Sequence, residues 1–308
     1  MTMPTLILTH PDCLDHRTPP GHPESPARLE AVLAALSAQP ALPLVWGEAP
    51  LASDEALLRV HPQAHLDFLA GRLPEPGGRP VAVDPDTSLS AGSLAAARRA
   101  AGAVVAGVDA VMTGAARAVF CAVRPPGHHA EPDQAMGFCL FNSVAVAARH
   151  ARAVHGLERV VVVDFDVHHG NGSQTLAEQD PHFFYASIHQ SPCYPGTGRA
   201  DETAHGNLIN LPVPPGTGSA AWLRAFETRL LPAVAAWQPQ LVIISAGFDA
   251  HRDDPLAGLA LATEDYARAT AGLCAIAPGR VVSALEGGYH LDALAACVRA
   301  HVGALSEA

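Results

Sequence analysis

The sequence alternates between short apolar runs and longer segments with the periodicity of amphipathic helices. A strand that is apolar at nearly every position needs cover on both faces, which is typical of a parallel sheet between two layers of helices. The apolar runs are residues 5–9, 118–123, 159–164, 183–188, 207–211, 241–246 and 280–285. The helical patterns occupy 26–38, 92–113, 142–154, 219–236, 263–277 and 291–305. We therefore predict an α/β fold with a mainly parallel central sheet.

The alternation continues without an internal repeat or a low-complexity linker, so we expect a single domain over residues 1–308. The net charge is −11, and all 19 basic residues are arginine, which argues against a nucleic-acid partner. No apolar run approaches the roughly 18 residues of a membrane helix, and we expect no membrane partner. The start of the chain lacks a secretory pattern, and six cysteines are scattered without finger spacing, so we expect a cytoplasmic protein.

Chemically reactive side chains gather directly after four of the predicted strands. The sequences there are "RPPGHHA", "DFDVHHGNG", "GFDAHRDD" and "EGGYH". Ligands of open parallel sheets bind beyond the carboxyl ends of the strands, where these loops meet. Any one of these residues alone is more often a cap or a satisfied polar group. Their occurrence together at one edge predicts a functional site.

A metal ion accounts for two of these loops. Asp166 and His168 are two residues apart, so in an extended segment their side chains point the same way. Asp249, after another strand, would be a third ligand and leave a position open for water, as in catalytic zinc sites. Two carboxylates and a neutral imidazole also cancel the charge of a divalent ion.

The remaining groups suit acid–base work beside such a metal. His128 and His129 are both candidates for the general base, with Asp164 and Asn171 as the groups that orient them. Tyr289 offers a phenolic donor for a developing oxyanion. Alternation points His169 away from this set, and we expect it to be structural. Seven further histidines lack a comparable context: His10, His22, His61, His65, His150, His155 and His205.

Together these motifs resemble the zinc-dependent histone deacetylase superfamily, in its class II-like bacterial branch. The motifs are "RPPGHHA", "GFCLFN", "DFDVHHGNGSQ", "SIHQSPCYPGTG", "SAGFDAHRDDPLAGL" and "LEGGYH", with "GHPESPARLEAV" at residues 21–32. The resemblance covers essentially the whole chain. It implies the arginase/deacetylase fold with an eight-stranded, mainly parallel sheet, and a zinc ion held by Asp166, His168 and Asp249.

The resemblance also implies roles for the other site residues. His129, backed by Asn171, is the general base and acid, and His128, backed by Asp164, stays largely protonated. Tyr289 polarises the carbonyl of the substrate, an acyl-lysine protein or a small acyl-amine.

Further positions correspond to the substrate tunnel, the product channel and a cation site. Phe138 and Tyr194 form the walls, Asp86 is the rim aspartate, and Arg28 lies near the product channel. Gly137 and Gly287 are also predicted to be substrate-binding residues. Leu256 stands where a polyamine-preferring relative has a gatekeeping Glu, which favours acyl-lysine over acetylpolyamines. The resemblance implies potassium bound through Asp164, Ser187 and Ile188. Oligomeric state, acyl length and the choice between zinc and ferrous iron stay open.

Two other functions remain to be tested. A dinuclear manganese ureohydrolase on the same sheet would need further Asp or His ligands around a second ion. A binding module for acyl-amines without catalysis would not need two histidines and Tyr289 beside the three ligands.

Overall fold

The computed structural model describes residues 4–39 and 42–307. In this described part, eight strands form one sheet in the order β2-β1-β5-β10-β9-β6-β7-β8, and all of its ladders are parallel. The strands are β1 Thr5–Thr9, β2 Leu44–Glu48, β5 Ala118–Cys121, β6 Val160–Asp164, β7 Phe183–Gln190, β8 Leu208–Val213, β9 Leu241–Ala246 and β10 Val281–Leu285. The predicted α/β fold is confirmed, with a sheet that is wholly rather than mainly parallel.

A second, antiparallel pair joins β3 (Val81–Ala82) to β4 (Ser88–Leu89) outside this sheet. Asp86 lies in the loop that joins these two strands.

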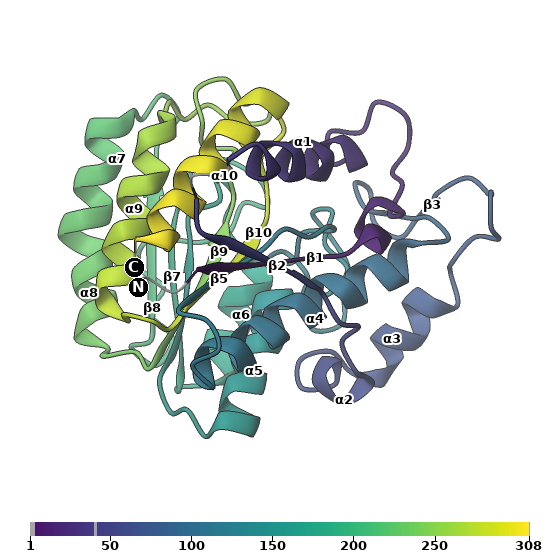
Figure 1. Ribbon diagram of the computed structural model, residues 1–308, viewed down its shortest axis with the longest axis horizontal. Helices are drawn as coiled ribbons and strands as arrows, with labels where there is room; N and C mark the ends of the chain where they lie inside the picture. The colour runs from purple at the N-terminus through teal and green to yellow at the C-terminus, as the bar shows by residue number, and fades with distance from the viewer. Residues whose placement is uncertain (1–3, 40–41, 308) are drawn as a thin grey trace.

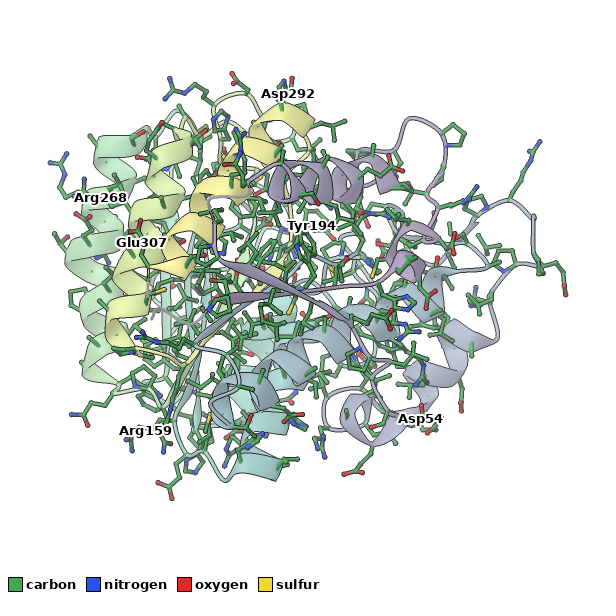
Figure 2. All side chains as sticks on the ribbon, viewed as in Figure 1. Asp54, Arg159, Tyr194, Arg268, Asp292 and Glu307 are labelled. Atoms are coloured by element: carbon green, nitrogen blue, oxygen red, sulfur yellow. The ribbon has the colours of Figure 1, made fainter. Side chains whose placement is uncertain are left out.

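Helices cover both faces of the sheet (Figure 1). Helices α4, α5 and α6 pack on one face, and α1, α9 and α10 form the layer on the other, with α7 and α8 beside α9. The helices are α1 Pro26–Ser37, α2 Asp54–Leu57, α3 Gln63–Ala70, α4 Ser93–Met112, α5 Ser143–His155, α6 Asn171–Gln179, α7 Ser219–Ala225, α8 Leu231–Ala236, α9 Thr263–Ile276 and α10 Leu291–Ser306. Charged residues such as Asp54, Arg159 and Arg268 lie around the outside of the molecule (Figure 2).

The centre of the sheet shows why these sequences form strands. β6 and β9 are buried at every position, and Val161 pairs with Val242 on one side and Phe184 on the other. Branched and aromatic side chains fit a pleated surface that is covered on both faces. The same tight core ends abruptly at Asp164, the last residue of β6, which is fully buried.

Strand order departs from chain order in a way that positions the site. β9 and β10 are the last two strands of the described chain, yet they lie in the middle of the sheet between β5 and β6. Their carboxyl ends therefore lie beside those of β5 and β6, and the loops that follow these four strands meet at one edge.

Several elements were not predicted from the sequence. They are β2, the β3–β4 pair and the helices α2, α3 and α6. The helical pattern at 219–236 is interrupted by a π-turn, Phe226–Leu230, between α7 and α8. Among the helices of residues 4–39 and 42–307, none combines the length and the apolar character that crossing a bilayer requires.

Candidate functional site

Two aspartates and one histidine lie close together at the carboxyl edge of the sheet. Asp166 and His168 follow β6, Asp249 follows β9, and all three are buried. One possible ligand atom from each lies within 4.8 Å of the others. The Nδ1 atom of His168 is 3.0 Å from Asp166 Oδ1 and 3.2 Å from Asp249 Oδ2. The structure thus brings the three predicted ligands together.

The hydrogen bonds of this group leave room for a cation. Within the described residues, Asp249 Oδ2 is a buried oxygen that accepts no hydrogen bond, because its 3.2 Å contact with His168 Nδ1 is an ion-pair contact without hydrogen-bond alignment. Backbone N–H groups occupy the other faces of the carboxylates: Val167 donates to Asp249 Oδ1 at 2.9 Å, and Gly287 donates to Asp166 Oδ2 at 2.8 Å. A buried carboxylate oxygen without a partner is costly unless an ion satisfies it.

Two glycines keep the space around these carboxylates open. A Cβ at Gly247 would collide with Asp166, and a Cβ at Gly287 would collide with both Asp249 and Asp166. Gly287, predicted among the substrate-binding residues, therefore lies against the carboxylates. The sequence contained this signal, because Gly247 directly follows β9 and Gly287 lies two residues after β10.

The pKa values of the two carboxylates indicate that the group Asp166, His168 and Asp249 lacks positive charge. Burial, followed by the charge of Asp166, raises the pKa of Asp249 to about 7. Burial alone would raise the pKa of Asp166, but the charge of His128 and the hydrogen bond of His168 hold it below its usual value. A donor set of two carboxylate oxygens and one imidazole nitrogen, closed to solvent on most sides, fits zinc or another divalent ion.

The adjacent residues His128 and His129 have different partners. His128 Nδ1 lies 2.9 Å from Asp164 Oδ2, and Asp164 also accepts a hydrogen bond from the Tyr185 hydroxyl at 3.0 Å. Burial would lower the pKa of His128, but the charges of Asp164 and Asp166 outweigh it and raise this pKa to about 10. His128 is therefore a cation at neutral pH.

His129 pairs with an uncharged side chain instead. Its Nδ1 lies 2.8 Å from Asn171 Oδ1. Burial, followed by the charges of His128 and His168, lowers the pKa of His129 well below its ordinary value. The surroundings thus favour the charged form of His128 and the neutral form of His129.

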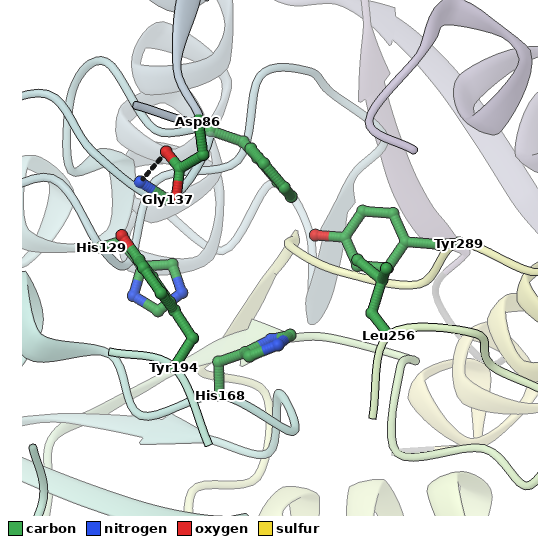
Figure 3. A pocket seen from close by; sticks show the side chains of 8 residues that line it. Asp86, His129, Gly137, His168, Tyr194, Leu256 and Tyr289 are labelled. Atoms are coloured by element: carbon green, nitrogen blue, oxygen red, sulfur yellow. Dashed lines mark hydrogen bonds between the residues drawn. The ribbon is translucent and has the colours of Figure 1, made fainter. Parts of the chain in front are cut away.

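A cavity of about 210 Å³ opens onto this group. Its lining residues are Asp86, His129, Gly137, Phe138, His168, Tyr194, Leu256 and Tyr289 (Figure 3). Tyr289 and Tyr194 lie on opposite sides of the pocket in this view, and the Tyr289 hydroxyl points into it. The Tyr194 ring meets the His129 ring edge-on, with centroids 5.0 Å apart. Apart from Gly287, all residues predicted to bind substrate line this one cavity.

The Phe138 wall has an unusual backbone. Gly137 and Phe138 have φ angles of +56° and +68°, and a Cβ at Gly137 would collide with the His129 ring. The turn is held by Asp86, whose Oδ1 accepts a hydrogen bond from the Gly137 N–H at 3.0 Å. Left-handed backbone at a residue other than glycine is typical of functional sites.

The loop after β10 is fixed by residues whose roles were not predicted. Asp254 Oδ2 accepts a hydrogen bond from the Tyr289 N–H at 2.7 Å, and its Oδ1 accepts one from Leu256 N–H at 3.0 Å. Glu286 Oε2 accepts hydrogen bonds from the N–H groups of Gly127, at 2.6 Å, and His128, at 3.2 Å. Both carboxylates lie within motifs quoted from the sequence, but nothing in the residue pattern identifies their hydrogen-bond partners.

Three other predicted residues lie beside the site. The Arg28 guanidinium lies 4.8 Å from the centre of the Tyr289 ring and donates to the Gly288 carbonyl at 2.6 Å. Ser187 pairs with Asp164 across β6 and β7, and Ile188 follows it, fully buried.

His169 points away from the pocket, as predicted from strand alternation. Its two ring nitrogens bond to Thr197 Oγ1 at 2.7 Å and Gln174 Oε1 at 2.8 Å. It therefore joins the loop after β6 to α6 and to the loop after β7, which is a structural role.

A second group of metal-ligand types lies between α4 and α5. His150 Nε2 and His155 Nε2 each lie 2.7 Å from the same oxygen, Asp109 Oδ1. Arg59 Nη1 lies 3.3 Å from His150 Nδ1. A guanidinium only donates, so His150 Nδ1 accepts and its proton is on Nε2, directed at Asp109. This nitrogen has no lone pair to offer a metal.

Comparison with known proteins gives a consistent result. A family model described as histone deacetylase domain matches residues 22–305. A protein of Synechocystis sp., slr0245, is 44% identical over 302 residues, which cover 95% of this chain and 96% of that protein. The histone deacetylase-like amidohydrolase of Pseudomonas aeruginosa is 40% identical over 283 residues, 87% of this chain and 73% of that protein. The crystal structure of the HDA15 HD domain superposes with a TM-score of 0.92 at 36% identity, covering 100% of this chain and 89% of that one.

Proposed function

The chain belongs to the histone deacetylase family, a family of hydrolytic enzymes, and we propose that it is a zinc-dependent amidohydrolase removing acetyl or other short acyl groups from N-acyl-lysine side chains. One observation carries this proposal. The buried group Asp166, His168 and Asp249 lies next to a pocket that His129 and Tyr289 line. A metal, a neutral base and a phenolic donor are thus available to one substrate carbonyl.

Asp166, His168 and Asp249 would hold the zinc ion. When bound, zinc supplies a Lewis acid that lowers the pKa of water and polarises the amide carbonyl. The remaining steps belong to the chain's own residues. His129 Nε2 accepts the proton of the attacking water and then donates it to the leaving amine, while its Nδ1–H stays directed at Asn171.

His128 and Tyr289 stabilise negative charge in this scheme. His128 keeps its proton because Asp164 and Asp166 raise its pKa to about 10, so it contributes a fixed positive charge beside the base. Burial raises the pKa of Tyr289, so its hydroxyl stays protonated. It donates a hydrogen bond to the oxygen of the tetrahedral intermediate.

The shape of the pocket supports a linear acyl-amine as substrate. A slot lined by Phe138, Tyr194 and Leu256 suits the apolar stem of an acyl-lysine, with the acyl group at the inner end. Acetylpolyamines have a similar stem and are the second candidate. A dinuclear manganese ureohydrolase is less well supported, because the buried ligand group found in the described residues has three members.

Further parts of the proposal have their own support. We propose one domain, because strands from both halves of the chain lie in one continuous sheet, in which β5 pairs with β10. All six cysteines are free thiols, which supports work in the reducing cytoplasm. The adjacency of Asp164 and Ser187 supports a potassium ion held there with main-chain atoms near Ile188.

The test is a kcat/KM panel on the zinc-loaded protein with acetyl-lysine peptides, longer acyl-lysines and acetylpolyamines. We expect the largest kcat/KM for an acyl-lysine, loss of turnover with a chelator and recovery with one zinc per chain. Preference for acetylpolyamines would select the second candidate. Absence of turnover on every substrate would support binding without catalysis, and recovery only with two manganese ions would support a ureohydrolase.

Tyr289→Phe tests the oxyanion donor. Removing this donor should lower kcat by about 10²-fold with zinc content unchanged. Tyr266→Phe is the matched control, because Tyr266 is also buried and its hydroxyl has no hydrogen-bond partner in the described residues. Equal kcat values for the two variants would contradict the role of Tyr289.

A further inference from the structure

Asn171 presents the two ends of its side-chain amide to different neighbours. Its Oδ1 faces His129 Nδ1 at 2.8 Å. Its Nδ2 faces Glu131 Oε1 at 2.6 Å, the His129 carbonyl at 3.2 Å and Met136 Sδ at 3.5 Å. The contact to Glu131 is the shortest of the three, and it pairs an amide donor with a carboxylate.

These neighbours decide which way round the amide lies. If the amide were reversed, its oxygen would face the Glu131 carboxylate, a carbonyl and a thioether sulfur. All three are acceptors. The reversed orientation would also direct an NH₂ group at His129 Nδ1 and so require the ring proton to be on Nε2. Glu131 Oε1 is the nearest of these acceptors, at 2.6 Å, so it contributes most to excluding this arrangement.

We propose that Glu131 is a positioning residue that acts through Asn171 to keep His129 in the Nδ1–H tautomer, with the Nε2 lone pair free as the base. This inference rests on the proposed function, because it concerns the same base. Glu131 does not line the cavity, so it touches neither substrate nor metal.

The position of Glu131 fits this role. It lies two residues beyond His129 in the "HHAE" loop, and its backbone N–H donates to the Gln134 carbonyl at 3.0 Å, which closes a tight turn. Asn171 is the first residue of α6 and 8% exposed. One end of the contact is therefore fixed by a helix and the other by a turn.

In this arrangement only one nitrogen of His129 exchanges a proton. The Nδ1–H of His129 stays in its hydrogen bond to Asn171 Oδ1 throughout. Nε2 takes one proton from water and returns it to the amine. The positive charge held by the ring between these two transfers is stabilised by the amide dipole of Asn171, which Glu131 aligns.

The experiment compares Glu131→Ala, Glu131→Gln and Asp133→Asn as holoenzymes. Loss of the acceptor in Glu131→Ala should lower kcat 10- to 100-fold, as loss of outer partners in such sites does. KM should stay within about twofold, because Glu131 lies outside the pocket. Glu131→Gln retains an acceptor oxygen for Nδ2 and should restore kcat to within about threefold of wild type. Asp133 is exposed in the same loop, and its variant should leave kcat unchanged.

A second readout does not depend on turnover. Two-bond ¹H–¹⁵N spectra of protein labelled with [¹⁵N]histidine distinguish the two neutral tautomers, and His129→Gln identifies the signals of His129. We expect the Nδ1–H tautomer in wild type and Glu131→Gln, and a mixture in Glu131→Ala. An unchanged tautomer in Glu131→Ala would overturn the proposal, including when kcat falls, since Glu131 would then only support the loop.

A double-mutant cycle keeps the test decisive if Glu131→Ala is poorly folded. An Asp at position 171 accepts from His129 with either oxygen, so it needs no aligning partner, and it is repelled by Glu131. In an Asn171→Asp background, Glu131→Gln should therefore raise kcat rather than lower it. A fall of the same size in both backgrounds would overturn the proposal. A wild-type protein inactive on all acyl-amines but with the expected tautomers would contradict the proposed function while supporting this inference.

Discussion

Two clusters in this molecule use the same residue types with different results. The group Asp166, His168 and Asp249 lies at the carboxyl ends of β6 and β9, and the group Asp109, His150 and His155 lies between α4 and α5. In the first, a buried carboxylate oxygen lacks a donor within the described residues. In the second, Asp109 Oδ1 receives both imidazoles, and its side chain is 47% exposed.

The difference lies in the hydrogen bonds rather than in the residue types. Arg59 supplies positive charge to the second cluster and fixes the proton of His150 on Nε2. Among residues 4–39 and 42–307, no arginine forms an ion pair with the first cluster, and glycines at 247 and 287 keep side chains out of it. A metal centre is therefore indicated by an unfilled need for positive charge, not by Asp and His alone.

The largest expected difference is in zinc affinity. Asp249→Ala removes a proposed zinc ligand and should weaken zinc binding by more than about 10²-fold. Loss of a residue that only hydrogen-bonds to a ligand costs up to about 10²-fold, and loss of a ligand should cost more. Asp109→Ala should leave zinc content at one per chain. Competition with a fluorescent chelator and elemental analysis measure both. A single retained zinc in Asp249→Ala, or equal losses in the two variants, would remove the distinction between the clusters.

A second difference should appear in the stability of the metal-free protein. The pKa of Asp249 is raised to about 7, so between about pH 4 and 7 the folded state binds a proton that the unfolded chain does not. Ionised Asp249 therefore destabilises the metal-free fold increasingly as pH rises through this window, and the penalty persists above it. Asp249→Asn should stabilise the metal-free protein by on the order of 2 kcal/mol at pH 8, and by little at pH 4.

The matched substitution at the surface should have the opposite sign. Burial would raise the pKa of Asp109, but hydrogen bonds from His150 and His155 lower it, so the carboxylate stabilises the fold. Asp109→Asn should lower stability by less than about 1 kcal/mol, because the pair is half exposed. Denaturant unfolding of both chelated variants at pH 8 gives the comparison. The same sign for both would show that the two carboxylates experience similar surroundings.

The smallest effect is expected from removing the guanidinium. Arg59→Ala frees His150 Nδ1 to carry the ring proton, so that Nε2 can offer a lone pair. A second zinc should then bind between α4 and α5, at least about 10²-fold more weakly than the first, since the Asp109 side chain is half exposed to solvent. Arg59→Ala combined with His155→Gln is the control. If wild type already binds this second ion in a zinc titration, Arg59 does not protect the cluster.

Much of the site was predictable because strand periodicity fixes which side chains face together. The apolar run of β6 stops at Asp164, so the end of the strand could be predicted. The alternating direction of side chains along the extended segment separates Asp166 and His168 from His169. The convergence of Asp249 and Tyr289 follows from the rule that parallel strands end at one edge. These inferences depend on short-range order and a simple topology.

The unpredicted parts depend on contacts between distant segments. β2 is an edge strand with mostly exposed positions, and its apolar run in "LVWGE" is only three residues long before Gly and Glu. Helix α6 begins at Asn171 and is polar, with "NGSQ" in its first turn, so it reads as a loop. Glu131 and Asp254 look like surface acids in the sequence, and only the fold reveals that they bond to Asn171 and to Tyr289.

Because β9 and β10 lie in the middle of the sheet, the sheet cannot close until these two strands have been synthesised. When residues up to 240 have emerged, β5 and β6 each have an unpaired edge, because the strands that join them are still unmade. Such edges invite pairing with other chains, so this is the stage at which the nascent protein most needs a chaperone. Asp249 arrives with the last strands, so the proposed metal site cannot be complete in a nascent chain until the sheet is nearly closed.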